Sequence, residues 1–418
     1  MNQGRRVLLI SSLGNALELY DFGLYGIFAA TIAETFFPAS SPTLALLATW
    51  ATFSTGFIIR PLGALAFGIV GDKVGRKAAL TLSILAMGLP TLVVALLPSF
   101  AAIGVAAPII LVLCRLLQGL SVGGEYNGAA IYALEHQGGK NRGLVSGVLL
   151  SAATLGILLA GMFAWLAELP GMPAWTWRVA FALGFVISLV GFSIRRLLEE
   201  SPEFAHSARG EALALKFIWR DYWREMLLTF SLAATAGSLT YVLLGYLGHH
   251  LQTFYGVSAH GRASISVFAG LVYTGLGPLA GMLYDRLGAR LHYGVVVPLA
   301  ALLLVPSSYG LFTRGGTVAI AAGVVLLAVQ AALTGSPHHA FSQDLFPTRC
   351  RYRGIGLSYS LGMGLLGGTT TFFAAVITTN TGIRYSPAVV TLLYTLVFFL
   401  LLRNFHRQQR RLKHPVKG

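Results

Sequence analysis

The stretch "GIVGDKVGRKAAL" (residues 68–80) follows an apolar segment of helix length, and a weaker copy, "GMLYDRLGARLHY", occupies residues 281–293. The aspartates of the two copies, Asp72 and Asp285, are 213 residues apart. A second pair of loops has nearly the same offset, because Gly143 and Gly354 are separated by 211 residues. Two loop types that recur at almost one spacing predict an internal duplication of the chain.

The composition predicts that these loops connect membrane spans. Of the 418 residues, 55% are hydrophobic and only 11% charged, and the mean hydropathy is +0.71, whereas a soluble domain carries about 25% charged residues. About twelve apolar stretches are each long enough to cross a hydrocarbon core of ~30 Å. The expected spans are residues 7–36, 44–70, 78–99, 103–136, 143–168, 177–198, 225–255, 262–284, 291–312, 316–345, 354–379 and 384–403.

The positions of the lysines and arginines predict the orientation of the chain. If the N-terminus is cytoplasmic, 24 of these 30 residues fall in cytoplasmic loops and ends, and 4 fall outside. The remaining two, Arg60 and Arg115, lie within spans. This asymmetry follows the positive-inside rule and predicts that both termini are cytoplasmic. The net charge of +15 is therefore interpreted as an orientation signal rather than a nucleic-acid-binding surface.

The predicted fold is all-α and integral to the membrane, with 12 transmembrane helices in two pseudo-symmetric six-helix bundles. The longest polar stretch, residues 195–225, lies between the sixth and seventh spans. The expected domains are an N-terminal bundle over residues 1–198, a cytoplasmic linker over 199–223, and a C-terminal bundle with a short tail over 224–418.

The G-D-x-x-G-R-K loop and its copy resemble the signature of the major facilitator superfamily. More narrowly, the chain is similar to metabolite:H⁺ symporters, which include citrate, 2-oxoglutarate, shikimate and proline/betaine carriers. Two departures from the family pattern are Asn127, where glycine is usual, and Arg353, which is expected to face the cytoplasm. The stretches that carry the resemblance are "GNALELYDFGLYG" (14–26), "FFP" (36–38), "RPLGALAFG" (60–68), "RLLQGLSVGGEYNGAA" (115–130), "WTWRVAF" (175–181), "RRLLEESPEF" (195–204) and "LFPTRCRYRGIGLSYSLGMGLLGGTTTF" (345–372).

The first span carries two carboxylates, Glu18 and Asp21, although a charged group is costly in hydrocarbon. Their spacing places them on one helix face with Asn15 and Tyr25. A buried carboxylate becomes cheaper when an opposite charge lies nearby, and Arg115 on the fourth span can supply one. In related sugar porters the residues that match Asp21 and Arg115 behave as such a pair. We predict that Asp21 couples transport to protons with Arg115 as its partner, and Glu18 is the second candidate. A static pair that fixes helix register is the alternative.

The candidate substrate ligands are polar side chains within spans of both halves. An anionic substrate would favour a guanidinium that donates two hydrogen bonds, and hydroxyl and imidazole groups of the second half suit a polar acid. Packing or an interfacial position is the alternative for each tyrosine, and a structural bond is the alternative for Glu125. The candidates are Asn15, Tyr25, Arg60, Arg115, Gln118, Glu125, Asn127, Tyr241, Tyr246, His338 and Tyr359.

The loop signature predicts a gate on the cytoplasmic side. The family resemblance implies that Asp72 and Arg76 pair across helix ends, here with Glu135 and Arg142, and hold that side shut. In the second half we expect corresponding pairs. The second-half residues are Asp285 with Arg286 and Asp344 with Arg349.

The leading functional hypothesis is a secondary active transporter in a bacterial-type inner membrane. It would take up a small polar organic acid, such as a mono- to tricarboxylate or a citrate-like siderophore, together with protons by alternating access. The alternatives are an exporter or exchanger, a symporter of a zwitterion such as betaine or proline, and a non-transporting nutrient sensor on the same fold. The sequence holds no G-x-S-x-G, H-E-x-x-H or P-loop motif, so no enzyme is expected.

The expected partners are an anionic small molecule and the lipid bilayer, not nucleic acid, and the chain is expected to work as a monomer. No cofactor or metal is expected, and protons, or alternatively Na⁺, would be the coupling ion. The two cysteines, Cys114 and Cys350, predict neither a disulfide framework nor a catalytic thiol.

Overall fold

The computed structural model describes residues 3–37, 48–49, 51–52, 55–167, 169, 171–196, 199–206 and 215–413. These residues are almost entirely helical and include no β-strand. Within them, ten helical segments are long and apolar enough to cross a membrane. One of the ten, Ser264–Arg314, is 51 residues long and contains a break, so it accounts for two expected spans. The start of the second expected span lies outside the described residues, and so does residue 38 of the "FFP" stretch.

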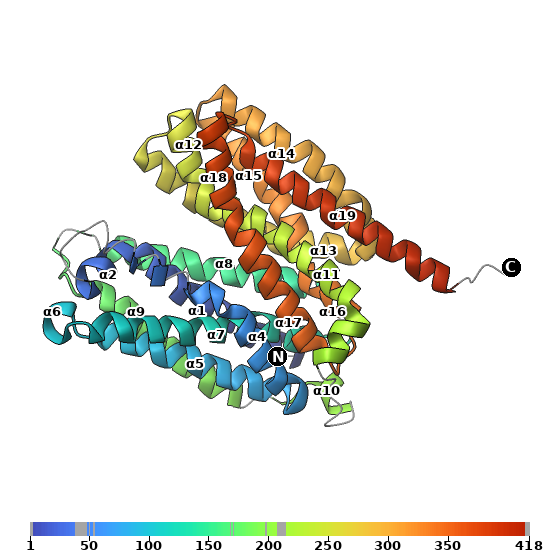
Figure 1. The fold of residues 1–418 in the computed structure, drawn as a ribbon, viewed down its shortest axis with the longest axis horizontal. Helices are drawn as coiled ribbons and strands as arrows, with labels where there is room; N and C mark the ends of the chain where they lie inside the picture. The colour runs from blue at the N-terminus through green and yellow to red at the C-terminus, as the bar shows by residue number, and fades with distance from the viewer. Residues whose placement is uncertain are drawn as a thin grey trace. The chain divides into compact units, whose positions relative to one another are not determined.

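The described chain forms two compact units. Unit 1 consists of residues 1–139, 152–213 and 348–357. Its core includes a cluster of aromatic and aliphatic side chains from α1, α2 and α9, in which Trp177 packs edge-on against Phe36 and Phe181. Helix α5 packs closely against α7 and α9 (Figure 1). Its helices are α1 (Gln3–Ile27), α2 (Ala29–Phe36), α4 (Arg60–Lys73), α5 (Arg76–Leu96), α6 (Phe100–Ile103), α7 (Ala106–Glu135), most of α8 (Arg142–Ala167), α9 (Thr176–Arg196), α10 (Pro202–His206) and the first turns of α17 (Arg351–Leu361).

Unit 2 consists of residues 140–151, 214–347 and 358–418. Its core joins leucines of α11 to Tyr273, Tyr293 and Phe312. Three π-helical turns, η1, η2 and η3, join consecutive helices within it. Its elements are the start of α8, α11 (Leu215–Tyr241), η1 (Val242–Tyr246), α12 (Leu247–Tyr255), α13 (Ala259–Leu291), η2 (His292–Val296), α14 (Val297–Arg314), α15 (Thr317–Gly335), α16 (His338–Leu345), the end of α17, η3 (Gly362–Gly367), α18 (Gly368–Thr381) and α19 (Ser386–Lys413).

Two short segments distinguish these units from the domains expected from the sequence order. Residues 348–357 belong to unit 1, where the Tyr352 hydroxyl donates to the Gly124 carbonyl at 2.8 Å. Residues 140–151 belong to unit 2, where the Ser151 hydroxyl donates to the Thr274 carbonyl at 2.6 Å. Part of the expected linker, residues 207–214, lies outside the described residues. The expected boundaries, 1–198, 199–223 and 224–418, remain a prediction.

The repeated loop has a glycine with positive φ at the same position in both halves. Gly75 has φ +138° and Gly288, 213 residues later, has φ +74°. Residues that carry a side chain rarely adopt such positive φ values, so both positions favour glycine. At Gly75 the space is also closed, because a Cβ would lie 2.1 Å from an Oε2 atom of Glu200. The turn conformation thus explains why glycine follows the aspartate by three residues in each copy.

Helices α4 and α7 approach so closely that only glycine fits between them. A Cβ on Gly63 would lie 2.0 Å from the Leu120 carbonyl oxygen, and one on Gly123 would lie 2.1 Å from that of Arg60. Such glycine contacts let membrane helices pack backbone to backbone. We expect Gly63→Val to destabilise the folded protein by at least about 1–3 kcal/mol, because the obstacle is backbone. Thermal unfolding in detergent measures this, with Gly161→Ala as the control, since no atom lies within 4 Å of that Cβ. Equal stability of the two variants would contradict the close approach.

Candidate functional site

The polar face of α1 is buried inside unit 1. Asn15, Glu18, Asp21 and Tyr25 are each no more than 3% exposed. Lipid offers no hydrogen bonds, so a membrane helix with such a face has to turn it toward other helices. The burial of all four side chains agrees with the shared helix face that their spacing predicts.

Asp21 is bound by side chains from α5 and α7. The Thr91 hydroxyl donates to its Oδ1 atom at 2.6 Å, and Gln118 Nε2 donates to its Oδ2 atom at 2.7 Å. Gln118 Nε2 also lies 2.9 Å from Thr91 Oγ1, which joins the three groups into one network. Both carboxylate oxygens therefore accept hydrogen bonds from neutral donors.

Arg115 lies near this network but does not form an ion pair with Asp21. It interacts electrostatically with the Asp21 carboxylate, yet no nitrogen–oxygen distance between them is 4.0 Å or less. Its guanidinium carbon lies 3.8 Å from the centre of the Tyr25 ring, a cation–π contact. Among the described residues, none of its three guanidinium nitrogens has a hydrogen-bond partner, although the side chain is fully buried. A buried donor without a partner typically costs about 1–3 kcal/mol, so this guanidinium is suited to bind an anionic group.

Glu125 is held by a buried arginine in the last turn of α9. Arg195 Nη1 donates to Glu125 Oε2 at 2.9 Å and to the Leu80 carbonyl at 2.7 Å, and Arg195 Nη2 donates to Glu125 Oε1. The Ser83 hydroxyl donates to the same carboxylate. Because Glu125 is occupied in this way, the contacts favour the structural alternative for this residue over substrate binding.

The remaining candidates of unit 1 differ in their surroundings. Asn127 is 1% exposed and its Oδ1 atom lacks a hydrogen-bond partner, as do both amide atoms of Asn15, within the described part of the chain. Arg60 is only partly buried, and its guanidinium carbon lies 4.4 Å from the Phe57 ring centre. Glu18 interacts electrostatically with Glu125 and Arg60. Buried amide atoms of the two asparagines thus have no hydrogen-bond partner among the described residues, whereas the Arg60 guanidinium contacts the Phe57 ring.

In unit 2 the structure brings His338 and Tyr359 together. Their rings are stacked, with centroids 4.9 Å apart and planes inclined by 16°. His339 also packs against Tyr359, with ring centroids 5.6 Å apart, so both neighbouring histidines contact the same ring. Tyr246 lies elsewhere, against His250 at 5.3 Å, and Tyr241 is partly buried at the end of α11.

A second polar cluster in unit 1, which we call the Asp72 hub, surrounds the repeated loop. Arg76 Nη1 and Arg353 Nε each lie 2.8 Å from an oxygen of Asp72. Arg351 Nη1 lies 2.9 Å from Glu135 Oε1, which Arg76 Nη2 approaches to 3.5 Å. Arg76 also donates to the Thr348 carbonyl at 2.8 Å. The hub therefore joins the predicted gate residues Asp72, Arg76 and Glu135 to the start of α17.

The predicted gate residues of unit 2 are arranged differently from the first-half cluster. Asp285 accepts from the backbone N–H groups of Gly143 and Leu144 at 2.7 and 2.8 Å, so it caps the start of α8. Arg142 pairs with Asp344, not with the Asp72 loop. The expected partners of the two aspartates, Arg286 and Arg349, are exposed, and no ion pair involves them within the described residues.

Several side chains that complete these clusters were not among the residues predicted from the sequence. Arg353 was expected to face the cytoplasm, but it is 3% exposed and binds Asp72. Thr91 and Ser83 gave no signal, because a lone hydroxyl in an apolar helix has no distinctive pattern. Arg195 could have been suspected only from its position directly at the end of an apolar span.

The comparisons with known proteins identify the family. A family model described as "Sugar (and other) transporter" matches residues 7–220. The proline/betaine transporter of Salmonella typhimurium is 31% identical over 432 residues, which cover 99% of this chain and 85% of that protein. The chain belongs to the major facilitator superfamily. The glycine betaine/proline/ectoine/pipecolic acid transporter OusA of Dickeya dadantii is 32% identical, and the match covers 99% of this chain and 85% of that protein. The inner membrane metabolite transport protein YhjE of Escherichia coli is also 32% identical, and the match covers 98% of this chain and 96% of that protein.

Solved structures confirm the expected fold of this transporter. The proton:xylose symporter XylE matches 96% of this chain and 95% of its own, with a TM-score of 0.78 and 16% sequence identity. The human organic anion transporter MFSD10 matches with a TM-score of 0.65 and 19% identity. The resemblance to metabolite:H⁺ symporters is confirmed by the relatives, and the protein is a multi-pass membrane transporter.

The transporter buries one cysteine beside the Asp72 hub, which allows a test of that cluster. Burial raises the pKa of the Cys350 thiol to about 12, and the Asp72 charge acts in the same direction. A rise from 9.0 to about 12 lowers the reactive thiolate fraction about a thousandfold. We expect maleimide at pH 7.5 to leave Cys350 unmodified in the folded transporter and to modify it in denaturant.

Loosening of the hub should expose this cysteine. In a Cys114→Ser background, Asp72→Asn removes the charge that binds Arg76 and Arg353, so we expect faster labelling of Cys350. Arg286→Gln is the matched control, because Arg286 is exposed and lies in unit 2. Equal labelling rates in the two variants would show that the hub does not hold the start of α17.

Proposed function

We propose that the transporter takes up a small zwitterion with one carboxylate, of the betaine and proline class, together with protons. The observation that carries the proposal is the fully buried guanidinium of Arg115, which has no hydrogen-bond partner among the described residues, close to the hydrogen-bonded carboxylate of Asp21. The relatives named proline/betaine transporters support the substrate class. We further propose a location in a bacterial inner membrane with both termini cytoplasmic, which the excess of cytoplasmic lysine and arginine supports.

The number of available cations favours one carboxylate over several. Arg115 can donate two parallel hydrogen bonds to a substrate carboxylate. Arg60, the second arginine expected within a span, is partly buried and is in contact with Phe57. A di- or tricarboxylate would leave charges uncompensated in this bundle, which is costly away from water. While Asp21 is ionised, a monocarboxylate whose second charge is positive leaves the site neutral overall.

Proton coupling follows from competition for Arg115. While the substrate is absent, Arg115 supplies the positive charge that compensates Asp21. A substrate carboxylate on Arg115 takes over that charge, and Asp21 is then more stable when it binds a proton. With Asp21 protonated, the substrate carboxylate and Arg115 compensate each other, and the cationic group of the zwitterion keeps its charge, so each cycle carries one net positive charge together with the substrate. Protons would then be the coupling ion, and Na⁺ is the alternative.

Uptake by the purified protein in liposomes tests this proposal. Labelled glycine betaine, proline, citrate and a monocarboxylate are offered with an inward proton gradient, with an inward Na⁺ gradient, and with neither. Accumulation of a zwitterion only under the proton gradient supports the proposal. Accumulation of citrate instead supports the organic-acid hypothesis. Exchange without accumulation indicates an exchanger, and binding without any flux indicates a sensor.

A further inference from the structure

We propose that helices α11 and α19 form a binding site for the phosphate headgroup of an anionic phospholipid. Both helices belong to unit 2, so the site lies within one compact unit. A cavity of about 70 Å³ opens between them. Its lining includes Trp223, Arg224, Leu227, Leu401, Asn404 and Phe405. This proposal is independent of the substrate of the transporter.

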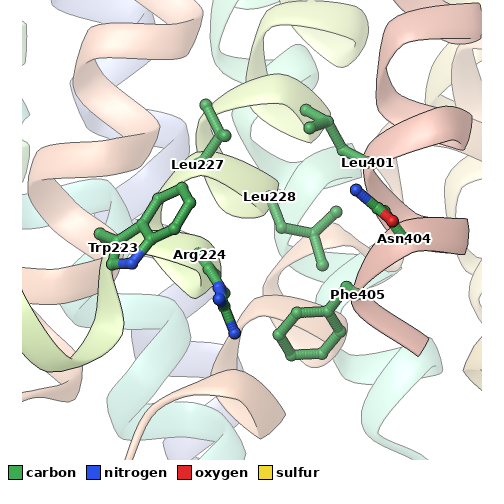
Figure 2. A pocket seen from close by; sticks show the side chains of 7 residues that line it. All are labelled: Trp223, Arg224, Leu227, Leu228, Leu401, Asn404 and Phe405. Atoms are coloured by element: carbon green, nitrogen blue, oxygen red, sulfur yellow. The ribbon is translucent and has the colours of Figure 1, made fainter. Parts of the chain in front are cut away.

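The cavity is lined mainly by apolar side chains, with Arg224 and Asn404 as its polar groups. Figure 2 shows Leu227 and Leu401 toward one end, and Arg224 with Phe405 toward the other. A neighbouring hollow of about 310 Å³ continues along α19 and shares Asn404 with the first. It adds Arg403 and Arg407, which lie one turn apart on the same helix face. A ligand that fits both hollows has an anionic head and an apolar body.

The three arginines of this site form no ion pair with a carboxylate of the described residues. Within the described residues, no carboxylate lies within 4.0 Å of Arg224, Arg403 or Arg407. Glu225 interacts electrostatically with Arg224 without forming an ion pair. By contrast Arg220, one turn earlier on α11, is bound by Asp221 at 2.6 and 3.1 Å. The charge complementarity of the site therefore favours a phosphate rather than an internal partner.

The site lies at the depth where lipid headgroups occur. The expected spans begin at residue 225 and end at residue 403, so the three arginines lie at the same end of α11 and α19. Trp223 is 48% exposed at this level, and Arg224 lies 5.3 Å from its ring centre. Tryptophan is enriched at the boundary between lipid and water. A soluble phosphate would not need the adjoining leucines, whereas the acyl chains of a phospholipid would cover them.

Lipid binding to the whole protein tests the site. Purified transporter in detergent is titrated with phosphatidylglycerol or phosphatidylcholine, and bound lipid is counted by native mass spectrometry. We expect the anionic lipid to bind more tightly. A triple variant should bind the anionic lipid about a hundredfold more weakly, because each arginine contributes about fivefold to the affinity. This variant combines Arg224→Gln, Arg403→Gln and Arg407→Gln. Arg220→Gln is the matched control and should change the affinity less than twofold, because Asp221 already compensates that charge.

A second measurement keeps the proposal testable if the triple variant folds poorly. Brominated phosphatidylglycerol should quench the fluorescence of Trp223 in the otherwise native protein, with Trp223→Phe as the reference. Equal binding of the two lipids, or unchanged binding by the triple variant, would overturn the proposal. Relief of this quenching by glycerol phosphate at the same concentration as the lipid would also overturn the proposal, because it would indicate a site for a soluble phosphate.

Discussion

Asp21→Asn is expected to abolish proton-driven accumulation of the substrate while exchange of bound substrate continues. Asparagine has nearly the same size, and its Oδ1 atom can still accept one of the two hydrogen bonds that Thr91 and Gln118 donate to separate oxygens of the carboxylate, at 2.6 and 2.7 Å. It cannot take up and release a proton, however. In liposomes with a gradient of about one pH unit, the wild-type protein should accumulate substrate up to about tenfold per coupled proton. The variant should stop at equal concentrations inside and outside.

Two comparisons separate coupling from a structural role for Asp21. Counterflow, in which unlabelled substrate inside drives entry of labelled substrate, should remain in the variant because it needs binding and alternation but no proton. Glu18→Gln, on the same face of α1, tests the second candidate for the coupling group. Tenfold accumulation by Asp21→Asn would assign coupling to another residue. Loss of both accumulation and counterflow would support a structural role for Asp21 in the network with Thr91 and Gln118.

The order and turns of the fold were accessible from sequence, because they depend on local chemistry. A run of about twenty apolar residues has few structures other than a membrane helix. The repeated loop needs a glycine with positive φ three residues after its aspartate, and both Gly75 and Gly288 have one. The start of α17 was not predicted to join unit 1, because its contacts depend on Tyr352 reaching a backbone carbonyl of α7. Nothing in the neighbouring sequence encodes that contact.

The candidate site was predictable where residues share one helix and less so where helices meet. Spacing placed Asn15, Glu18 and Asp21 on one face, and all three are buried. Spacing does not give the distance between two helices, so the ion pair expected between Asp21 and Arg115 is replaced by bonds from Thr91 and Gln118. Counting charges to predict orientation fails for a different reason. It assigns every arginine near a span end to the loop, and Arg195 is such a residue.

Arg195→Ala is expected to be among the most destabilising single substitutions in unit 1. Arg195 is 2% exposed and its guanidinium donates to both oxygens of Glu125 and to the Leu80 carbonyl. Removing it leaves a buried carboxylate whose one remaining hydrogen-bond partner among the described residues is the Ser83 hydroxyl. Breaking a buried ion pair in this way typically costs about 3–5 kcal/mol. Thermal or denaturant unfolding in detergent measures the loss, and Arg196→Ala, one residue later and exposed, is the matched control.

The double variant Glu125→Gln with Arg195→Met distinguishes a lost charge balance from a lost side-chain volume. Methionine fills part of the space against α1, where a Cβ on Gly14 would lie only 1.9 Å from Arg195 Nη2. Glutamine keeps the contact with Ser83 and carries no charge. We expect the double variant to recover most of the stability, because replacing both members of a buried pair is often nearly neutral. Wild-type stability of Arg195→Ala alone would refute the assignment of this pair. Recovery of stability together with substrate uptake would place Glu125 in the structure of the bundle, whereas recovery of stability without uptake would restore it as a substrate ligand.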